Sequence, residues 1–179
     1  VVRGSEPTPL SALIIKPNGA RAIVSYRGNS EGLCAGKFDL TKLRAKSILI
    51  DGNQFEFATE LLQAAKARQI PTVIDAEVFN PQNAELVQLV DYVVASERFA
   101  RNYSGDDDVQ AGLAKLATVA ENVVVTLGER GLIWQRGTTR GALDAFPVVA
   151  VDTTGAGDAF HGAFAAGLAN AMAWDELLR

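Results

Sequence analysis

Ser47-Ile48-Leu49-Ile50-Asp51 is a short run with an apolar interior that closes on a carboxylate. Similar runs follow at Ile70–Asp75, Asp91–Ala95 and Asn122–Leu127. They are apolar throughout rather than alternately polar and apolar, which is typical of parallel strands buried on both faces. Segments with helical spacing separate them. The stretch 47–127 therefore predicts an α/β fold with three layers, a sheet between two layers of helices.

The elements around these four strands can be predicted from the spacing of their apolar residues. Between the strands we expect helices over Phe55–Arg68, Ala84–Val90 and Val109–Val119. After them we expect two more strands, Gly131–Arg136 and Ala142–Val151, and then a helix of small residues over Ala159–Ala171. These segments complete one α/β core.

The N-terminal segment has the pattern of a β-hairpin. Leu10–Lys16 and Arg21–Tyr26 are strand-like runs on either side of Pro17-Asn18-Gly19. We expect residues 1–30 to form a small β lid and residues 31–179 to form the core. Because an exposed two-stranded edge invites pairing, we also expect a homodimer. The start without Met and the helix-like end after Trp174 suggest a piece of a longer chain.

Composition narrows the class of protein. The formal net charge of −4 argues against a nucleic-acid partner. Cys34 is the single cysteine, so a disulfide within the chain and a zinc site built on cysteines are both excluded. The chain has no apolar run of membrane-spanning length and no signal-peptide pattern at its start. We expect a cytoplasmic protein without a membrane partner.

Polar residues close three of the predicted strands. They are Asp51, Asp75 and Thr126. In open α/β sheets the ligand crevice lies outside the carboxyl ends of the strands. We therefore expect these residues at the floor of a site, with Asp51 and Asn53 lining its substrate side, although Asp51 could equally cap the next helix.

The segment Asp152-Thr153-Thr154-Gly155-Ala156-Gly157-Asp158 carries the chemistry. Its glycines let the backbone turn sharply between a strand and a helix, and the helix start supplies unpaired N–H groups. Such a turn can bind the negative charge on a phosphoryl group in transfer. Asp158 can accept a proton from an attacking hydroxyl. On spacing alone, a tight turn with a capping Asp is equally compatible.

Two motifs resemble those of the PfkB (ribokinase-like) carbohydrate kinases. Asp152 to Phe160 is similar to the C-terminal signature of that family, and Thr126-Leu127-Gly128-Glu129-Arg130-Gly131 is similar to its nucleotide-contact turn. The hairpin of Leu10–Tyr26 resembles its lid. The resemblance implies a ribokinase-like fold and a kinase that transfers the γ-phosphoryl group of ATP to a sugar hydroxyl, with Mg²⁺ and in some members K⁺.

The resemblance also implies residue roles. Asp158 would be the catalytic base, and the amides of Gly155, Ala156 and Gly157 would form the anion hole. The remaining roles would be nucleotide binding by Thr126, Gly128 and Gly131, and a monovalent-cation site at Asp152 and Thr154. His161, after Asp158-Ala159-Phe160, and the replacement below favour the ketohexokinase and sulfofructose kinase side of the family.

The chain departs from the family pattern in three places. Ser96-Glu97-Arg98-Phe99 stands where many members have Asn-x-x-Glu, so Glu97 would take over only part of the role of organising magnesium and phosphate. The N-terminal Gly-rich sugar signature and the C-terminal adenine segment are absent from these residues.

Several alternatives stay open. An oxidoreductase with a dinucleotide at Gly155–Gly157 is disfavoured, because Phe160 occupies the third glycine position. A catalytically inactive sugar- or nucleotide-binding module would share the same motifs. Arg21 or Arg27 could bind an anionic sugar substituent, or either could be a solvated strand-edge residue. For His161, packing near the site is favoured over a ligand role.

Overall fold

The central sheet carries the fold. The computed structural model describes residues 7–15, 21–26, 36, 38–150 and 152–179. Within them the sheet has the strand order β3-β4-β5-β6-β7-β8. The first four strands are parallel and the last two run antiparallel. The strands are β3 (Ile48–Ile50), β4 (Thr72–Ala76), β5 (Tyr92–Ser96), β6 (Asn122–Thr126), β7 (Leu132–Arg136) and β8 (Thr139–Leu143).

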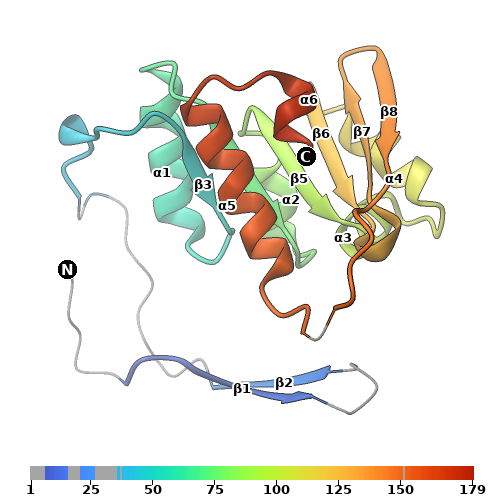
Figure 1. Ribbon diagram of the computed structural model, residues 1–179. Coiled ribbons are helices and arrows are strands. Elements are labelled where there is room, and N and C mark those ends of the chain that lie inside the picture. The colour runs from blue at the N-terminus through green and yellow to red at the C-terminus, as the bar shows by residue number, and fades with distance from the viewer. Residues whose placement is uncertain (1–6, 16–20, 27–35, 37, 151) are drawn as a thin grey trace.

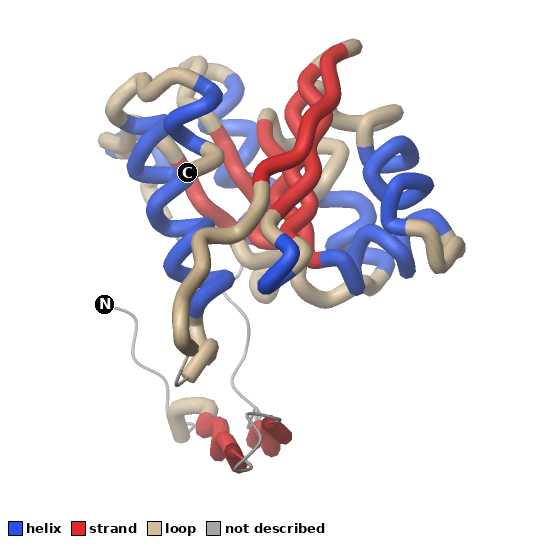
Figure 2. Tube along the Cα trace, turned by 45° about the vertical axis from the view of Figure 1, so that its right-hand side comes forward, coloured by secondary structure: helices blue, strands red, loops and turns tan. Residues whose placement is uncertain are grey.

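Helices cover this sheet on both sides (Figures 1 and 2). They are α1 (Phe55–Lys66), α2 (Pro81–Leu86), α3 (Glu97–Ser104), α4 (Val109–Leu116), α5 (Ala156–Ala169) and α6 (Trp174–Leu177). Two short 3₁₀ turns, η1 (Leu40–Lys42) and η2 (Gly128–Arg130), complete the elements of the core. The α/β fold that the sequence predicts is confirmed.

Neighbouring residues of each strand enter different halves of the core. Ile74 and Val93 belong to a buried cluster with residues of α1 to α4. Val73 and Val94 belong to a second cluster with Phe164 of α5 and residues of α6. Because successive side chains point to opposite faces of a sheet, each strand must be apolar on both sides. This is why the strands read as continuous apolar runs.

Two expectations about the core were wrong or incomplete. The strand expected over Ala142–Val151 ends at Leu143, where its pairing with β7 ends, and residues 144–150 follow without regular structure. Val149 is 97% exposed there. An apolar, β-branched sequence did not form a strand at this place, because no neighbouring strand pairs with it. Helix α3 was missed, although Ser96 caps its first turn and Gly105 ends it with φ of 76°.

The hairpin is also present. β1 (Leu10–Ile15) and β2 (Arg21–Tyr26) pair antiparallel, with Leu10 opposite Tyr26 and Ile15 opposite Arg21. Figure 1 shows the hairpin apart from the sheet and its helices, beyond the end of the molecule at which α5 begins. The expected turn at residues 17–19 and the proposed boundary at residue 30 lie outside the described residues, so the division into lid and core stays a prediction.

The helices that the structure describes are all too short or too polar to cross a bilayer.

Candidate active site

Polar residues gather at the carboxyl edge of the parallel strands, as expected. Asp51 follows β3, Glu77 follows β4, and Ser96 ends β5. The hydroxyl of Ser96 donates to the carbonyl oxygen of Glu77 at 3.3 Å, and Thr126 Oγ1 of β6 donates to Ala95 O at 3.4 Å. These contacts join neighbouring strand ends into one polar edge.

Helix α5 brings its first turn to this edge. Near the far end of the helix, Ser47 Oγ, just before β3, donates to Ala165 O at 2.7 Å. Nearer the start, His161 Nε2 lies 3.1 Å from Val94 O, close to the end of β5. The helix is therefore antiparallel to the strands, and its positive dipole end lies at the carboxyl edge.

The glycine turn opens α5 as the sequence predicts. Gly155 is its N-cap with φ of 76°, a left-handed conformation that glycine adopts without strain. Gly157 and Asp158 are the second and third helical residues, whose N–H groups have no acceptor within the helix. Ala156 N donates to Thr153 O at 3.2 Å, so this amide of the predicted anion hole already has a partner.

Asp158 is exposed and bends back over the glycine turn. Its Oδ2 lies 3.7 Å from the position that a Cβ on Gly155 would occupy. Just before the turn, Asp152 Oδ1 accepts from Thr154 N at 2.8 Å. The predicted base, the glycine turn and the predicted cation residues are consecutive in the sequence, and all of them lie at the start of α5.

Asp75 and His161 meet beneath this segment. Asp75 Oδ1 lies 3.4 Å from His161 Nε2. Burial raises the pKa of Asp75, the electrostatic interaction with His161 opposes that rise, and the nearby carboxylates of Glu77, Asp158 and Asp51 add to it. Acidic groups from β3, β4 and α5 therefore converge. The sequence pointed to Asp75 as a strand-end residue, but not to its pairing with a histidine 86 residues further on.

The predicted substrate residues Asp51 and Asn53 form a tight turn after β3. Asp51 Oδ1 accepts from Asn53 N at 3.0 Å, and its Oδ2 accepts from Asn53 Nδ2 at 2.6 Å. The alternative that Asp51 caps α1 was wrong, because Gln54 is the N-cap residue of that helix. The turn holds both side chains at the carboxyl edge.

Replacing Gly52 should test how closely this turn packs. Gly52 has φ of 74°, and a Cβ there would lie 2.1 Å from Oδ1 of the buried Asn83. We expect Gly52→Ala to lower the free energy of unfolding by about 2–3 kcal/mol, measured by urea denaturation. Gly105→Ala is the matched control, because φ is 76° there but the space is open. Equal losses for the two variants would contradict the packing argument.

The predicted nucleotide residues form a second closed turn. Gly131 N donates to Gly128 O at 3.0 Å, and Leu127 N donates to Gly131 O at 2.7 Å. Gly131 has φ of 87°, and a Cβ on it would lie 2.0 Å from Leu143 O. Gly131 is thus required for packing against the end of β8, whatever part it takes in nucleotide binding.

Glu97 lies beside this turn and pairs with two arginines. Its Oε1 is 2.7 Å from Arg101 Nη2, and its Oε2 accepts from Arg130, which belongs to the Gly128–Gly131 turn. The spacing of four residues along α3 could have predicted the first pair. The second joins residues 33 positions apart, so no local pattern in the sequence could have predicted it.

The predicted contacts of Arg27 and Arg21 with an anionic substituent fall outside what the structure describes. Arg27 lies outside the described residues, and of Arg21 only the place in β2 is described. Both stay predictions as contacts of an anionic substituent.

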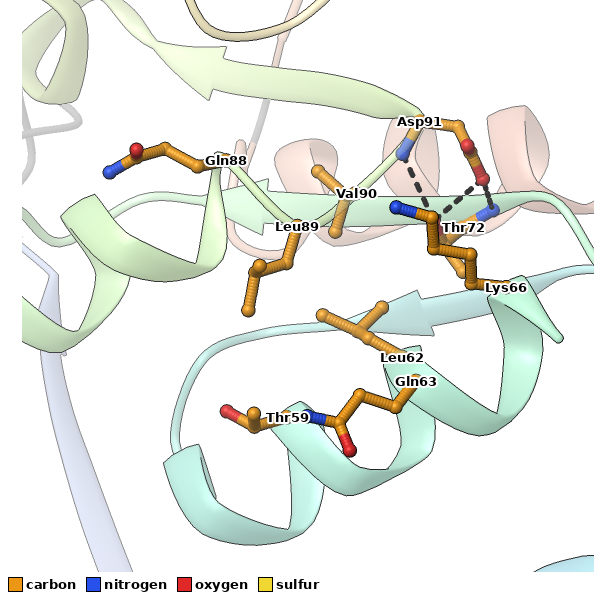
Figure 3. Close-up of a pocket in the computed structure, with 9 residues that line it drawn as sticks. All are labelled: Thr59, Leu62, Gln63, Lys66, Thr72, Gln88, Leu89, Val90 and Asp91. Carbon is orange, nitrogen blue, oxygen red and sulfur yellow. Dashed lines mark hydrogen bonds between the residues drawn. The ribbon is translucent and has the colours of Figure 1, made fainter.

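A cavity of about 260 Å³ lies at the opposite, amino edge of the sheet (Figure 3). Two of its polar residues pair with each other, since Asp91 Oδ2 accepts from Thr72 N at 2.9 Å and from Thr72 Oγ1 at 2.8 Å. This cavity is remote from the glycine turn. Among the described residues, no three His, Cys, Asp or Glu side chains are grouped as metal ligands.

A glycine turn that opens a helix at the carboxyl edge of a largely parallel sheet is typical of α/β proteins that bind phosphate groups. Residues 1–179 match the pfkB family carbohydrate kinases. The chain therefore belongs to the PfkB family.

Named relatives agree with this assignment. The chain is 27% identical to a ribokinase of Lactococcus lactis over 177 residues, which is 97% of this chain and 58% of that protein. It is 42% identical to a fructokinase of Klebsiella pneumoniae over 86 residues, 45% of this chain and 27% of that protein. The crystal structure of a Thermotoga maritima ribokinase superposes with a TM-score of 0.79 at 27% identity, covering 99% of this chain and 61% of the other.

Proposed function

We propose that the protein is an ATP-dependent carbohydrate kinase that transfers the γ-phosphoryl group to a sugar hydroxyl. The observation that carries this proposal is the Gly155–Gly157 turn, which opens α5 at the carboxyl edge with Asp158 in the first helical turn. The chain spans 58% of the length of its Lactococcus relative. The kinase activity is therefore proposed for the full-length protein.

Asp158 is the proposed base. Its carboxylate is exposed at the helix start, where a sugar hydroxyl can approach it. As the hydroxyl oxygen attacks the γ-phosphorus, Asp158 takes up its proton, and the bond from phosphorus to the bridging oxygen of ADP breaks. A weak base is sufficient, because phosphoryl transfer depends mainly on positioning and charge stabilisation.

The start of α5 is the proposed anion hole. The N–H groups of Gly157 and Asp158 have no acceptor within the helix, and the helix dipole adds positive potential. Donors aimed at the charge that develops on the phosphoryl oxygens lower the barrier. Gly155 and Ala156 belong to the same turn, with the Ala156 amide partly engaged by Thr153 O.

ATP is assigned to the turn at Thr126, Gly128 and Gly131, beside Glu97. Mg²⁺ usually binds through one or two carboxylates, phosphates and water, so the lack of a larger ligand cluster among the described residues is compatible with it. Glu97 is the proposed carboxylate. Since both of its oxygens contact arginines, direct ligation would require one of these ion pairs to open. Mg²⁺ would neutralise phosphate charge.

The sugar is assigned to the side of Asp51 and Asn53, with Arg27 a candidate for an anionic substituent. Asp152 and Thr154 are proposed to hold a monovalent cation such as K⁺, because carboxylate and backbone oxygens suit such ions. A ketose or sulfosugar is the first choice of acceptor, given the histidine that follows Asp158-Ala159-Phe160.

The test is ATP consumption by the full-length protein against ketoses, aldoses, sugar phosphates, sulfosugars and nucleosides. Magnesium would be present, with and without potassium. Turnover with one acceptor would establish the kinase and name its substrate. Nucleotide binding without turnover on any acceptor would favour the inactive binding module instead.

We also propose a cytoplasmic homodimer that pairs through the hairpin. Val24 is 63% exposed and Ile14 58% exposed, on one face of it. We expect Val24→Asp to halve the mass measured by light scattering, because a buried charge opposes pairing. Leu89→Asp changes an exposed apolar residue outside the hairpin, on the surface of the α/β domain, and should leave the mass unchanged. A wild-type monomer would contradict the proposal.

A further inference from the structure

The ring of His161 has hydrogen-bond acceptors at both of its nitrogens. Nδ1 lies 2.6 Å from Gly157 O, and Nε2 lies 3.1 Å from Val94 O and 3.4 Å from Asp75 Oδ1. His161 is 4% exposed, so water does not substitute for these partners. A buried ring held from both sides in this way has one favoured orientation.

The place of a ring proton follows from these partners. A carbonyl oxygen accepts hydrogen bonds and cannot donate them. The contact of 2.6 Å with Gly157 O therefore requires an N–H on Nδ1, which donates to that carbonyl. Nε2 faces Val94 O and Asp75 on the other side of the ring.

The contact with Gly157 O reaches the proposed anion hole. The peptide that carries Gly157 O also carries the N–H of Asp158, and the two point in opposite directions because the peptide is planar and trans. A donor that fixes the carbonyl therefore also fixes the amide. A hydrogen bond to the carbonyl polarises the peptide and makes its N–H a stronger donor.

We infer that His161 is a positioning residue for phosphoryl transfer. Through its Nδ1–H, it fixes and polarises the Gly157–Asp158 peptide, whose N–H faces the phosphoryl group. It does not contact the substrate. The functional half of this inference rests on the proposed kinase activity, whereas the hydrogen bond from Nδ1 to Gly157 O does not.

NMR of the nitrogen-labelled full-length protein tests this hydrogen bond. The ring signals that disappear in His161→Gln are those of His161. We expect Nδ1 of that ring to carry a proton that exchanges slowly with water, because His161 is 4% exposed and Nδ1 lies 2.6 Å from Gly157 O. An unprotonated Nδ1 in the wild-type ring would overturn the inference.

Kinetics test the positioning. We expect His161→Gln to lower kcat about tenfold while KM for ATP changes less than about twofold, since a helix-start donor is misplaced but the nucleotide turn is intact. Ser47→Ala is the matched control, because it removes a side-chain hydrogen bond from another element to a carbonyl of α5, near the far end of the helix. It should retain kcat. Full kcat in His161→Gln, or an equal loss in Ser47→Ala, would overturn the positioning role.

Failure of the kinase proposal would look different. A wild-type protein that transfers no phosphoryl group to any acceptor refutes that proposal and, with it, the positioning role. The NMR measurement would still decide whether Nδ1 of His161 carries the proton that the contact with Gly157 O requires.

Discussion

Asp158→Asn should reduce phosphoryl transfer by about 10³-fold or more while ATP binding stays nearly intact. The amide keeps the shape of the side chain but cannot accept the proton of the sugar hydroxyl, and general-base catalysis contributes about 10² to 10⁴ in rate. The measurements are kcat by coupled ADP release and ATP affinity by calorimetry. The nucleotide turn at Gly128–Gly131 is left unchanged by this substitution.

A control is needed because Asp158 also lies in the first turn of a helix, where a carboxylate interacts favourably with the dipole. Its removal could cost about 0.3–1 kcal/mol of stability. Asp175→Asn is matched to it, since Asp175 is an exposed acid in the first turn of α6. It should lose similar stability and no activity. Near-normal turnover by Asp158→Asn would remove Asp158 from the role of base.

Gly131→Ala should produce the largest loss of stability among the glycine variants, about 3 kcal/mol or more. Its backbone has φ of 87° and ψ of −130°, which residues with a Cβ avoid. A Cβ would lie 2.0 Å from Leu143 O and 2.7 Å from Ala145 N, and backbone atoms cannot rotate away as a side chain can. Urea denaturation would measure the loss.

Gly137→Ala separates the two causes. Gly137 also has positive φ, 56°, but nothing lies within 4 Å of a Cβ there. We expect it to cost about 1 kcal/mol, which is the backbone contribution alone. An equal loss of unfolding free energy in Gly131→Ala and Gly137→Ala would contradict the packing argument. Residues 143–145 would then have to move away from the new Cβ at little cost.

The order of strands and helices could be predicted from the sequence because local patterns determine it. Val73 and Ile74 are both apolar since each faces a different layer of helices, and that alone indicated a buried parallel sheet. The glycine turn and the acid at position 158 were readable for a similar reason. A sharp turn and a helix start need particular residues at fixed spacing.

Some local signals were present and misread. The apolar run over residues 144–150 looked like a strand, but strands need hydrogen-bonding neighbours, and the pairing of β8 with β7 ends at Leu143. Ser96 and Gly105 marked α3, yet its surface is mostly polar, so apolar spacing did not reveal it. Periodicity reports burial, and an element with a small buried face gives a weak signal.

The sequence by itself determined the α/β order, the family and the segment that carries the proposed chemistry, because each depends on residues close together in the chain. Only the tertiary structure decided which distant charges meet. Glu97 pairs with Arg130, and His161 contacts Asp75 and Val94 O, because the parallel strands end at one edge and α5 runs back along them. No local spacing encodes such contacts, since they arise from the packing of separate elements.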